Sequence, residues 1–253
     1  MKKDVVRQGL VIISTIFTLI MNSIANIIPL NGLKTGEISD NFKVLFVPAG
    51  YVFSIWGIIY IGLIAYTIYQ TLPKQTANPI LRKTGWLITL SNLANGSWIF
   101  FWHYGFYVVT LMIMSILLVV LIMVYLRLDI GRTRFNTLEK WVIAIPISIY
   151  LGWITVATMA NATAVLSYLK WDGWGLSDLT WTIILLVIGV LLAGVVAFNR
   201  SDIAFLLVLV WAFTGISVRW LQLPVLNAAG FAAAGLVLLL LIYSRLRHAP
   251  ART

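Results

Sequence analysis

Eight apolar stretches, each about as long as a membrane is thick, dominate this chain of 253 residues. A helix needs ~20 such residues to cross a hydrocarbon layer of ~30 Å. The eight stretches run through residues 8–30, 48–72, 83–104, 106–127, 140–168, 179–198, 203–222 and 224–244. Hydrophobic residues make up 61% of the chain and charged residues 10%, which excludes an ordinary soluble domain. We therefore predict an all-α integral membrane protein with about eight transmembrane helices.

The basic residues between these stretches predict an orientation. Placing the N-terminus in the cytoplasm leaves only Lys34, Lys43, Lys170 and Arg219 outside, and an even number of spans returns the C-terminus to the cytoplasm. The cytoplasmic set is Lys2, Lys3, Arg7, Lys74, Arg82, Lys83, Arg127, Arg132, Arg134, Lys140, Arg200, Arg245, Arg247 and Arg252. This pattern predicts a multi-pass plasma-membrane protein and explains the net charge of +10 without nucleic acid as a partner.

Several kinds of chemistry are disfavoured by what the chain lacks. It has no cysteine, and its two histidines, His103 and His248, lie far apart, so we expect no metal site. No nucleophile elbow, phosphate loop or Ser/His/Asp set occurs, so we predict no catalytic residues. All carboxylates lie in loops or at the ends of spans, which disfavours a proton-coupled pump.

Three of the spans carry large aromatic residues interleaved with amides or small residues. Lipid does not require such side chains, so at helical spacing they need a protein partner or a ligand. We predict that these faces line a ligand-binding pocket in the outer half of the membrane, beneath the long connection 31–47. The residues are Phe53, Trp56 and Tyr60 in the second span, Asn92, Asn95 and Trp98 in the third, and Tyr150, Trp153, Ala157 and Asn161 in the fifth.

Each of these residue types also has a purely structural explanation. Tryptophans gather at membrane interfaces, and we assign Trp86, Trp102, Trp141, Trp171, Trp174, Trp181 and Trp220 to that role. Alternatively, the amide side chains form hydrogen bonds between helices and contact no ligand. Arg219 has two readings, a side chain that snorkels to the outer surface or an anion site. The small residues 228–235 suit close helix packing within the chain or a homodimer.

Three motifs resemble those of the translocator protein / tryptophan-rich sensory protein (TspO/MBR) family. The segment Pro48-Ala49-Gly50-Tyr51-Val52-Phe53, followed by Trp56 and Tyr60, is similar to the family's second-helix Pro-Pro-Gly-Trp-Val-Phe motif. Ala94-Asn95-Gly96-Ser97-Trp98 looks like its third-helix Leu-Asn-x-x-Trp. Tyr150, Trp153, Ala157, Thr158 and Asn161 match its fifth-helix pattern without a gap. The first match has one residue fewer before Trp56, and Pro is absent before Tyr150.

The resemblance implies a five-helix bundle over residues 1–170, followed by three further helices and a basic tail over 171–253. It implies a pocket for porphyrins, sterol-like lipids or benzodiazepine-type compounds, covered by the loop after the first helix. Trp56 and Trp153 match tryptophans linked in bacterial members to light-dependent porphyrin breakdown, and Asn95 and Trp98 match pocket residues. No resident cofactor is implied beyond such a porphyrin or haem-like ligand.

The favoured functional hypothesis is a membrane receptor, sensor or carrier that binds a tetrapyrrole or a similar flat apolar ligand. Its partners would be membrane lipid and that small molecule. One alternative is a transporter or transport-complex subunit, which needs a continuous polar path to the cytoplasm. A second alternative is an enzyme that degrades porphyrin by photo-oxidation, in which loss of Trp153 would abolish the activity.

Overall fold

The computed structural model describes residues 2–28 and 30–247, so Pro29, His248 and Arg252 lie outside the described part of the chain. Eight long helices and no strand occur within those ranges, which confirms the predicted all-α fold. The long helices are α1 (Lys2–Ile27), α3 (Ile55–Thr71), α4 (Pro79–His103), α5 (Tyr107–Arg127), α7 (Ile145–Tyr168), α8 (Asp178–Arg200), α9 (Ile203–Arg219) and α10 (Pro224–Arg247). The short elements are α2 (Thr35–Asp40), α6 (Thr137–Glu139), the π turn Lys140–Ala144 and the 3₁₀ turns Leu30–Gly32, Gly50–Ser54, Pro73–Gln75 and Gly173–Gly175.

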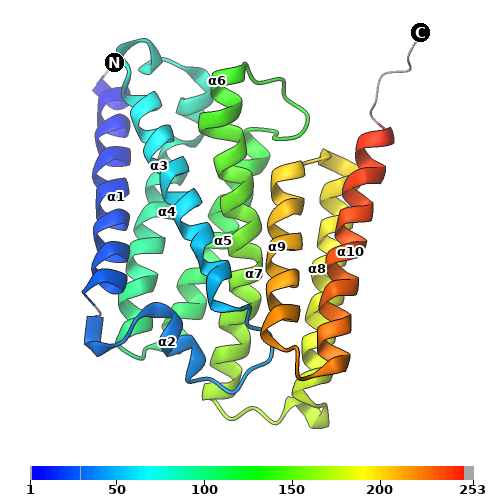
Figure 1. Ribbon diagram of the computed structural model, residues 1–253. Helices are drawn as coiled ribbons and strands as arrows, with labels where there is room; N and C mark the ends of the chain where they lie inside the picture. Colours follow the sequence, from blue (N-terminus) through cyan, green and yellow to red (C-terminus); the bar gives the residue numbers. More distant parts are fainter. Residues whose placement is uncertain (1, 29, 248–253) are drawn as a thin grey trace.

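Six segments of the described chain are long and apolar enough to cross a membrane: Lys2–Ile27, Gly50–Thr71, Tyr107–Arg127, Thr137–Tyr168, Asp178–Arg200 and Pro224–Arg247. The other two predicted spans form helices that run beside them (Figure 1). α9 is apolar but has only 17 residues, and α4 has 25 residues but a more polar composition. α4 packs between α1 and α5, which cover much of its surface, so it does not have to be apolar on every side.

The helices form two adjoining groups around α7 (Figure 1). In the first group α1, α3, α4, α5 and α7 pack together, with α4 between α1 and α5. In the second group α8, α9 and α10 pack on one another, and α9 packs on α7. We call the end where α1 begins and α10 ends the terminal face. The opposite end carries the connection from α1 to α3, and we call it the loop face.

Local sequence explains how α7 and α9 begin. Pro146 has no N–H to give to the preceding turn, and the helix widens just before it into the π turn Lys140–Ala144. Ser201 adopts a left-handed conformation that ends α8, and the Asp202 carboxylate then accepts hydrogen bonds from the backbone N–H groups of Ala204 and Phe205. The turn from α8 to α9 is therefore short, which keeps the two helices adjacent.

Small residues allow the helix backbones to approach closely. Gly152 of α7 faces Val208 of α9, and a Cβ there would lie 3.1 Å from the Val208 Cβ. Gly230 of α10 faces Ser217 of α9, where an added Cβ would lie 2.3 Å from the Oγ. The small-residue stretch 228–235 thus packs at least partly within the chain, and a homodimer stays a prediction.

We expect Gly62→Ala to destabilise the protein because the new Cβ would lie 2.7 Å from the Cβ of Pro146, whose ring cannot turn away. Overpacking of this kind costs about 1–3 kcal/mol. Gly57→Ala on the same helix is the matched control, since nothing lies within 4 Å of its added Cβ and alanine favours the helix. Thermal unfolding in detergent should show a lower Tm for Gly62→Ala only. Equal Tm values for both variants would contradict the close contact.

Candidate ligand cavity

A small cavity lies between α3, α4, α5 and α7 near the loop face. Its volume is about 60 Å³. Most of its wall is aromatic or aliphatic. The lining residues are Thr35, Ser39, Val47, Pro48, Phe53, Trp56, Trp98, Trp102, Met114, Trp153, Val156, Ala157, Ala160 and Asn161.

Two clusters of aromatic rings contribute to the lining of this cavity. In the first, the Trp153 ring meets Phe53 and Trp56 edge to face, with centroids 5.8 and 6.1 Å apart. In the second, Trp98 and Trp102 stack at 5.4 Å with their planes 17° apart. Such ring pairs are stabilised both by the apolar area that they bury and by the electrostatic attraction between the rings. The stacked Trp98 and Trp102 rings thus offer a flat surface suited to a flat apolar ligand, whereas Trp153 meets its two neighbours edge to face.

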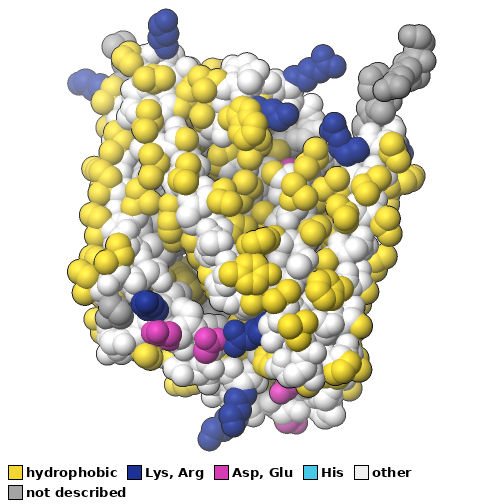
Figure 2. Space-filling model, in the orientation of Figure 1, with side chains coloured by type: hydrophobic (Ala, Val, Ile, Leu, Met, Phe, Trp, Pro, Cys, Tyr) yellow, Lys and Arg dark blue, Asp and Glu magenta, His cyan; other side chains and the backbone are white. Residues whose placement is uncertain are grey.

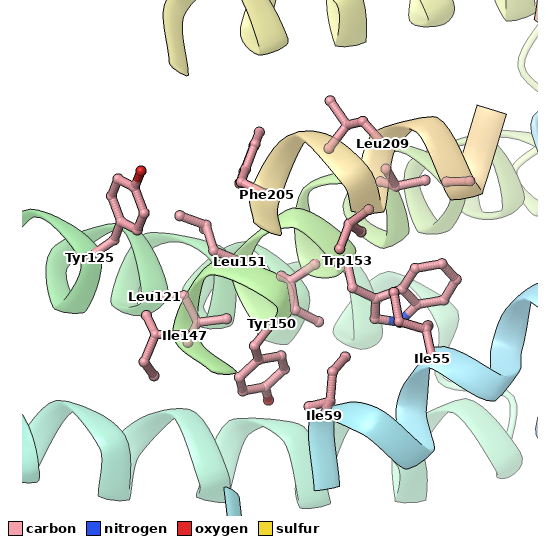
Figure 3. Packing of buried hydrophobic residues seen from close by; sticks show 14 of the residues in the cluster. Ile55, Ile59, Leu121, Tyr125, Ile147, Tyr150, Leu151, Trp153, Phe205 and Leu209 are labelled. Carbon is pink, nitrogen blue, oxygen red and sulfur yellow. The ribbon is translucent and has the colours of Figure 1, made fainter. Parts of the chain in front are cut away.

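One polar group in the wall has no partner. The side chain of Trp153 is only 2% exposed, and its Nε1–H finds no acceptor among the described residues. Figure 3 shows the Trp153 indole on α7 beside Ile55 of α3. An unpaired buried donor costs about 1–3 kcal/mol. Because the nitrogen itself is buried, a ligand acceptor would recover that free energy only after the side chains around the indole move.

Six of the ten predicted site residues line the cavity: Phe53, Trp56, Trp98, Trp153, Ala157 and Asn161. Asn161 is held by its neighbours, since its Nδ2 donates to Thr110 Oγ1 at 3.1 Å and its Oδ1 accepts from Trp98 Nε1 at 3.4 Å. The structure thus brings the three predicted aromatic faces together at one place.

The other four predicted residues do not line the cavity. Tyr60 stacks on Trp56 at 5.6 Å, one turn farther from the loop face. Asn92 turns toward α1, where its Nδ2 donates to Thr15 Oγ1 at 2.9 Å and its backbone carbonyl accepts from Thr18 Oγ1 at 2.7 Å. Asn92 therefore links two helices through hydrogen bonds. This is the structural role that the sequence offered as the alternative to ligand binding.

Asn95 and Tyr150 lie directly behind the cavity wall. Asn95 accepts from Asn22 Nδ2 at 2.8 Å and donates to the Tyr150 hydroxyl at 2.8 Å. The Tyr150 ring in turn meets Trp56 at 6.3 Å. This chain of contacts joins α1, α4 and α7 and fixes the ring against which Trp56 rests.

The connection from α1 to α3 covers the cavity and contributes Thr35, Ser39, Val47 and Pro48 to its lining. The end of α4 holds one part of this cover. Trp102 Nε1 donates to the Thr35 carbonyl at 3.2 Å, and the His103 ring bonds both Thr35 Oγ1 and the Leu30 carbonyl at 3.0 Å. His103 is thus a structural residue that fixes the loop.

α9 holds the rest of the cover. Trp220 Nε1 donates to the Leu45 carbonyl at 2.8 Å, and Trp211 Nε1 donates to the Val52 carbonyl at 3.1 Å. The Gly215 carbonyl accepts from the backbone N–H of Ala49 at 3.0 Å. The close approach requires glycine, because a Cβ at Gly215 would lie 2.2 Å from Val52 Cγ2.

Arg219 completes this anchor. It forms an ion pair with Asp40 at 2.6 Å, and its guanidinium lies over the Trp220 ring. Arg219 therefore binds a carboxylate at the end of α2, inside the loop. The sequence had suggested only a snorkelling side chain or an anion site.

The interfacial role assigned to Trp102 is wrong, since this side chain is 4% exposed and lines the cavity. Its spacing of four residues from Trp98 was the available signal, but its place at the end of the span favoured an interfacial reading. Sequence reasoning also missed Thr35 and Ser39, which carry no periodic pattern. By contrast Trp86, Trp141 and Trp174 are half exposed or more.

These features define a class: an α-helical membrane protein with a loop-covered aromatic cavity inside a helix bundle. A family model for TSPO-like proteins matches residues 8–243. The chain belongs to this TSPO-like family, and the match includes the last three helices. Neither a curated protein nor a solved structure matches the chain.

We expect Trp220→Phe to loosen the cover, because it keeps a ring at this position but removes the hydrogen bond to Leu45. One such bond contributes about 1 kcal/mol, so opening should become about fivefold more frequent. Amide hydrogen exchange of residues 35–47 would measure this. Trp174→Phe, on the same face but exposed, is the control and should leave that exchange unchanged. Equal exchange in both variants would show that α9 does not hold the loop.

Proposed function

We propose that this TSPO-like protein is a membrane sensor or carrier that binds a tetrapyrrole, or a similar flat apolar ligand with a hydrogen-bond acceptor, in the aromatic cavity. The observation that carries the proposal is the convergence of Phe53, Trp56, Trp98 and Trp153 on one cavity. The Nε1–H of Trp153 is buried and has no partner among the described residues. Family membership supports a general ligand-binding or sensing role in a membrane.

The size of the cavity adds a mechanical requirement. Sites for drug-sized ligands have volumes of ~300–1,000 Å³, whereas this cavity has about 60 Å³. A tetrapyrrole therefore binds only if the walls separate. The cover between α1 and α3 is the part able to move, since hydrogen bonds and one ion pair hold it, whereas the helices behind are packed. Access from the loop face with displacement of this cover is the route we propose.

The structure offers less support for transport. Between the cavity and the terminal face lies a layer of buried side chains that includes Ile59, Leu121, Ile147 and Tyr150 (Figure 3). The polar side chains beside this layer, among them Thr15, Asn92 and Asn95, are engaged in hydrogen bonds between α1, α4 and α7. Binding with release to the same side agrees better with this arrangement.

Protoporphyrin IX added to the purified protein should quench tryptophan fluorescence in a saturable way. Trp153→Leu should weaken binding about 30-fold, because it removes about 2 kcal/mol of ring contact. Trp153→Phe, which keeps a ring but lacks the N–H, should lose about fivefold. Trp86→Leu is the control, since this half-exposed side chain lies outside the cavity. Identical affinities in all variants would place the porphyrin elsewhere.

A second experiment tests the access route. The chain has no cysteine, so Asp40→Cys with Arg219→Cys introduces the only two thiols. A cleavable bifunctional thiol reagent should then tie the cover to α9 and slow porphyrin association at least tenfold. Cleavage of the reagent should restore the rate. An unchanged association rate after complete cross-linking would exclude access beneath this cover.

A further inference from the structure

A second and much larger hollow lies on the side of the molecule, apart from the aromatic cavity. Its volume is about 1370 Å³, and it runs between α3 and α9 with α7 as its floor. Both α3 and α9 pack on α7. They are joined near the loop face by the bond from Trp211 to Val52. We call this hollow the lateral groove; Figure 2 shows the face on which it lies.

The walls of the lateral groove are apolar over most of their length. Ile58 of α3 is 56% exposed and Leu207 of α9 is 48% exposed, so both remain accessible from the lipid side. Ile149 forms part of the floor. From Ile203 to Trp211 the α9 wall rises by ~12 Å, close to half of a ~30 Å hydrocarbon layer. The apolar part is therefore about one leaflet deep.

The mouth of the groove, at the terminal face, is basic. Arg132, Arg134, Lys140, Arg200 and Arg245 line it, and basic side chains surround this end in Figure 2. Arg134, Lys140 and Arg245 are exposed and form no ion pair within the described residues. Three cations thus converge from the 128–136 connection, the π turn and the end of α10.

The acidic groups nearby are already engaged. Asp129 forms an ion pair with Arg200. Asp202, the carboxylate that lines the groove, accepts from Ser148 Oγ at 2.6 Å and caps α9. Glu139, next to Lys140 in the chain, accepts from the Tyr69 hydroxyl at 3.2 Å. Arg134, Lys140 and Arg245 are therefore left without an ion pair among the described residues, and an anion from outside the described chain would supply one.

We propose that the lateral groove binds one anionic phospholipid from the leaflet at the terminal face. Its phosphate lies among Arg134, Lys140 and Arg245, and its acyl chains lie along Ile58, Ile149 and Leu207. A basic mouth between transmembrane helices recognises anionic headgroups, and the groove depth matches one leaflet. A water-soluble anion would leave the apolar walls unused, and a neutral lipid would leave the three cations unpaired.

The test compares the binding of dioleoyl phosphatidylglycerol and dioleoyl phosphatidylcholine to the full-length protein in detergent by native mass spectrometry. We expect one phosphatidylglycerol to be retained with at least tenfold preference. The triple variant Arg134→Gln, Lys140→Gln, Arg245→Gln should abolish the preference. Glycerol 3-phosphate, which lacks acyl chains, should not displace the lipid.

Three further variants separate a specific site from general attraction to a basic surface. Lys74→Gln, Lys83→Gln, Arg247→Gln removes the same charge from the same face outside the groove and should keep the preference. Ile58→Trp with Leu207→Trp fills the groove without a change of charge and should abolish retention. Leu191→Trp with Leu239→Trp, on lipid-facing positions, should not. Equal loss in both charge variants, or retention in the filled groove, would overturn the proposal.

Discussion

The hydrogen bond from Asn95 to the Tyr150 hydroxyl is the interaction on which the cavity depends. It joins α4 to α7 within the buried part of the bundle. An amide or hydroxyl without a partner there would cost free energy, because no water is present to form the hydrogen bond. Asn95 is itself held by Asn22 of α1. Because Tyr150 supports Trp56, which meets Trp153 edge to face, the position of one cavity wall is set by polar contacts behind it.

The sequence predicted the helices well because hydrocarbon allows few solutions. A long apolar run must form a helix, so all eight predicted spans are helical. It also placed Phe53, Trp56, Trp98 and Trp153 together, since helical spacing puts regular side chains on one face. It failed for side chains whose role depends on a neighbouring helix. Asn92 and Asn95 are three residues apart and chemically identical, yet one contacts only α1 and the other also contacts α7.

The loop contacts were beyond sequence reasoning for a different reason. Trp211 bonds the backbone carbonyl of Val52, and Trp220 bonds that of Leu45, so each bond joins residues more than 150 positions apart. Every residue has a backbone carbonyl, so the sequence does not indicate which one will accept. These contacts give the last three helices a role. α9 stands beside the bundle and fixes the cover of a cavity that lies between α3, α4, α5 and α7, so α9 and the site form one mechanical unit.

The cavity and the lateral groove share a wall. Phe53 and Trp56 face the cavity, while Ser54 and Ile55, between them in the chain, line the groove. Trp211 lines the groove and also holds Val52 in the same short segment. An occupant that pressed on Trp211 or Ile55 would therefore act on the backbone that positions Phe53. Since packed interfaces shift between discrete arrangements rather than deform smoothly, a shift of residues 52–56 would alter the lining of both the cavity and the groove.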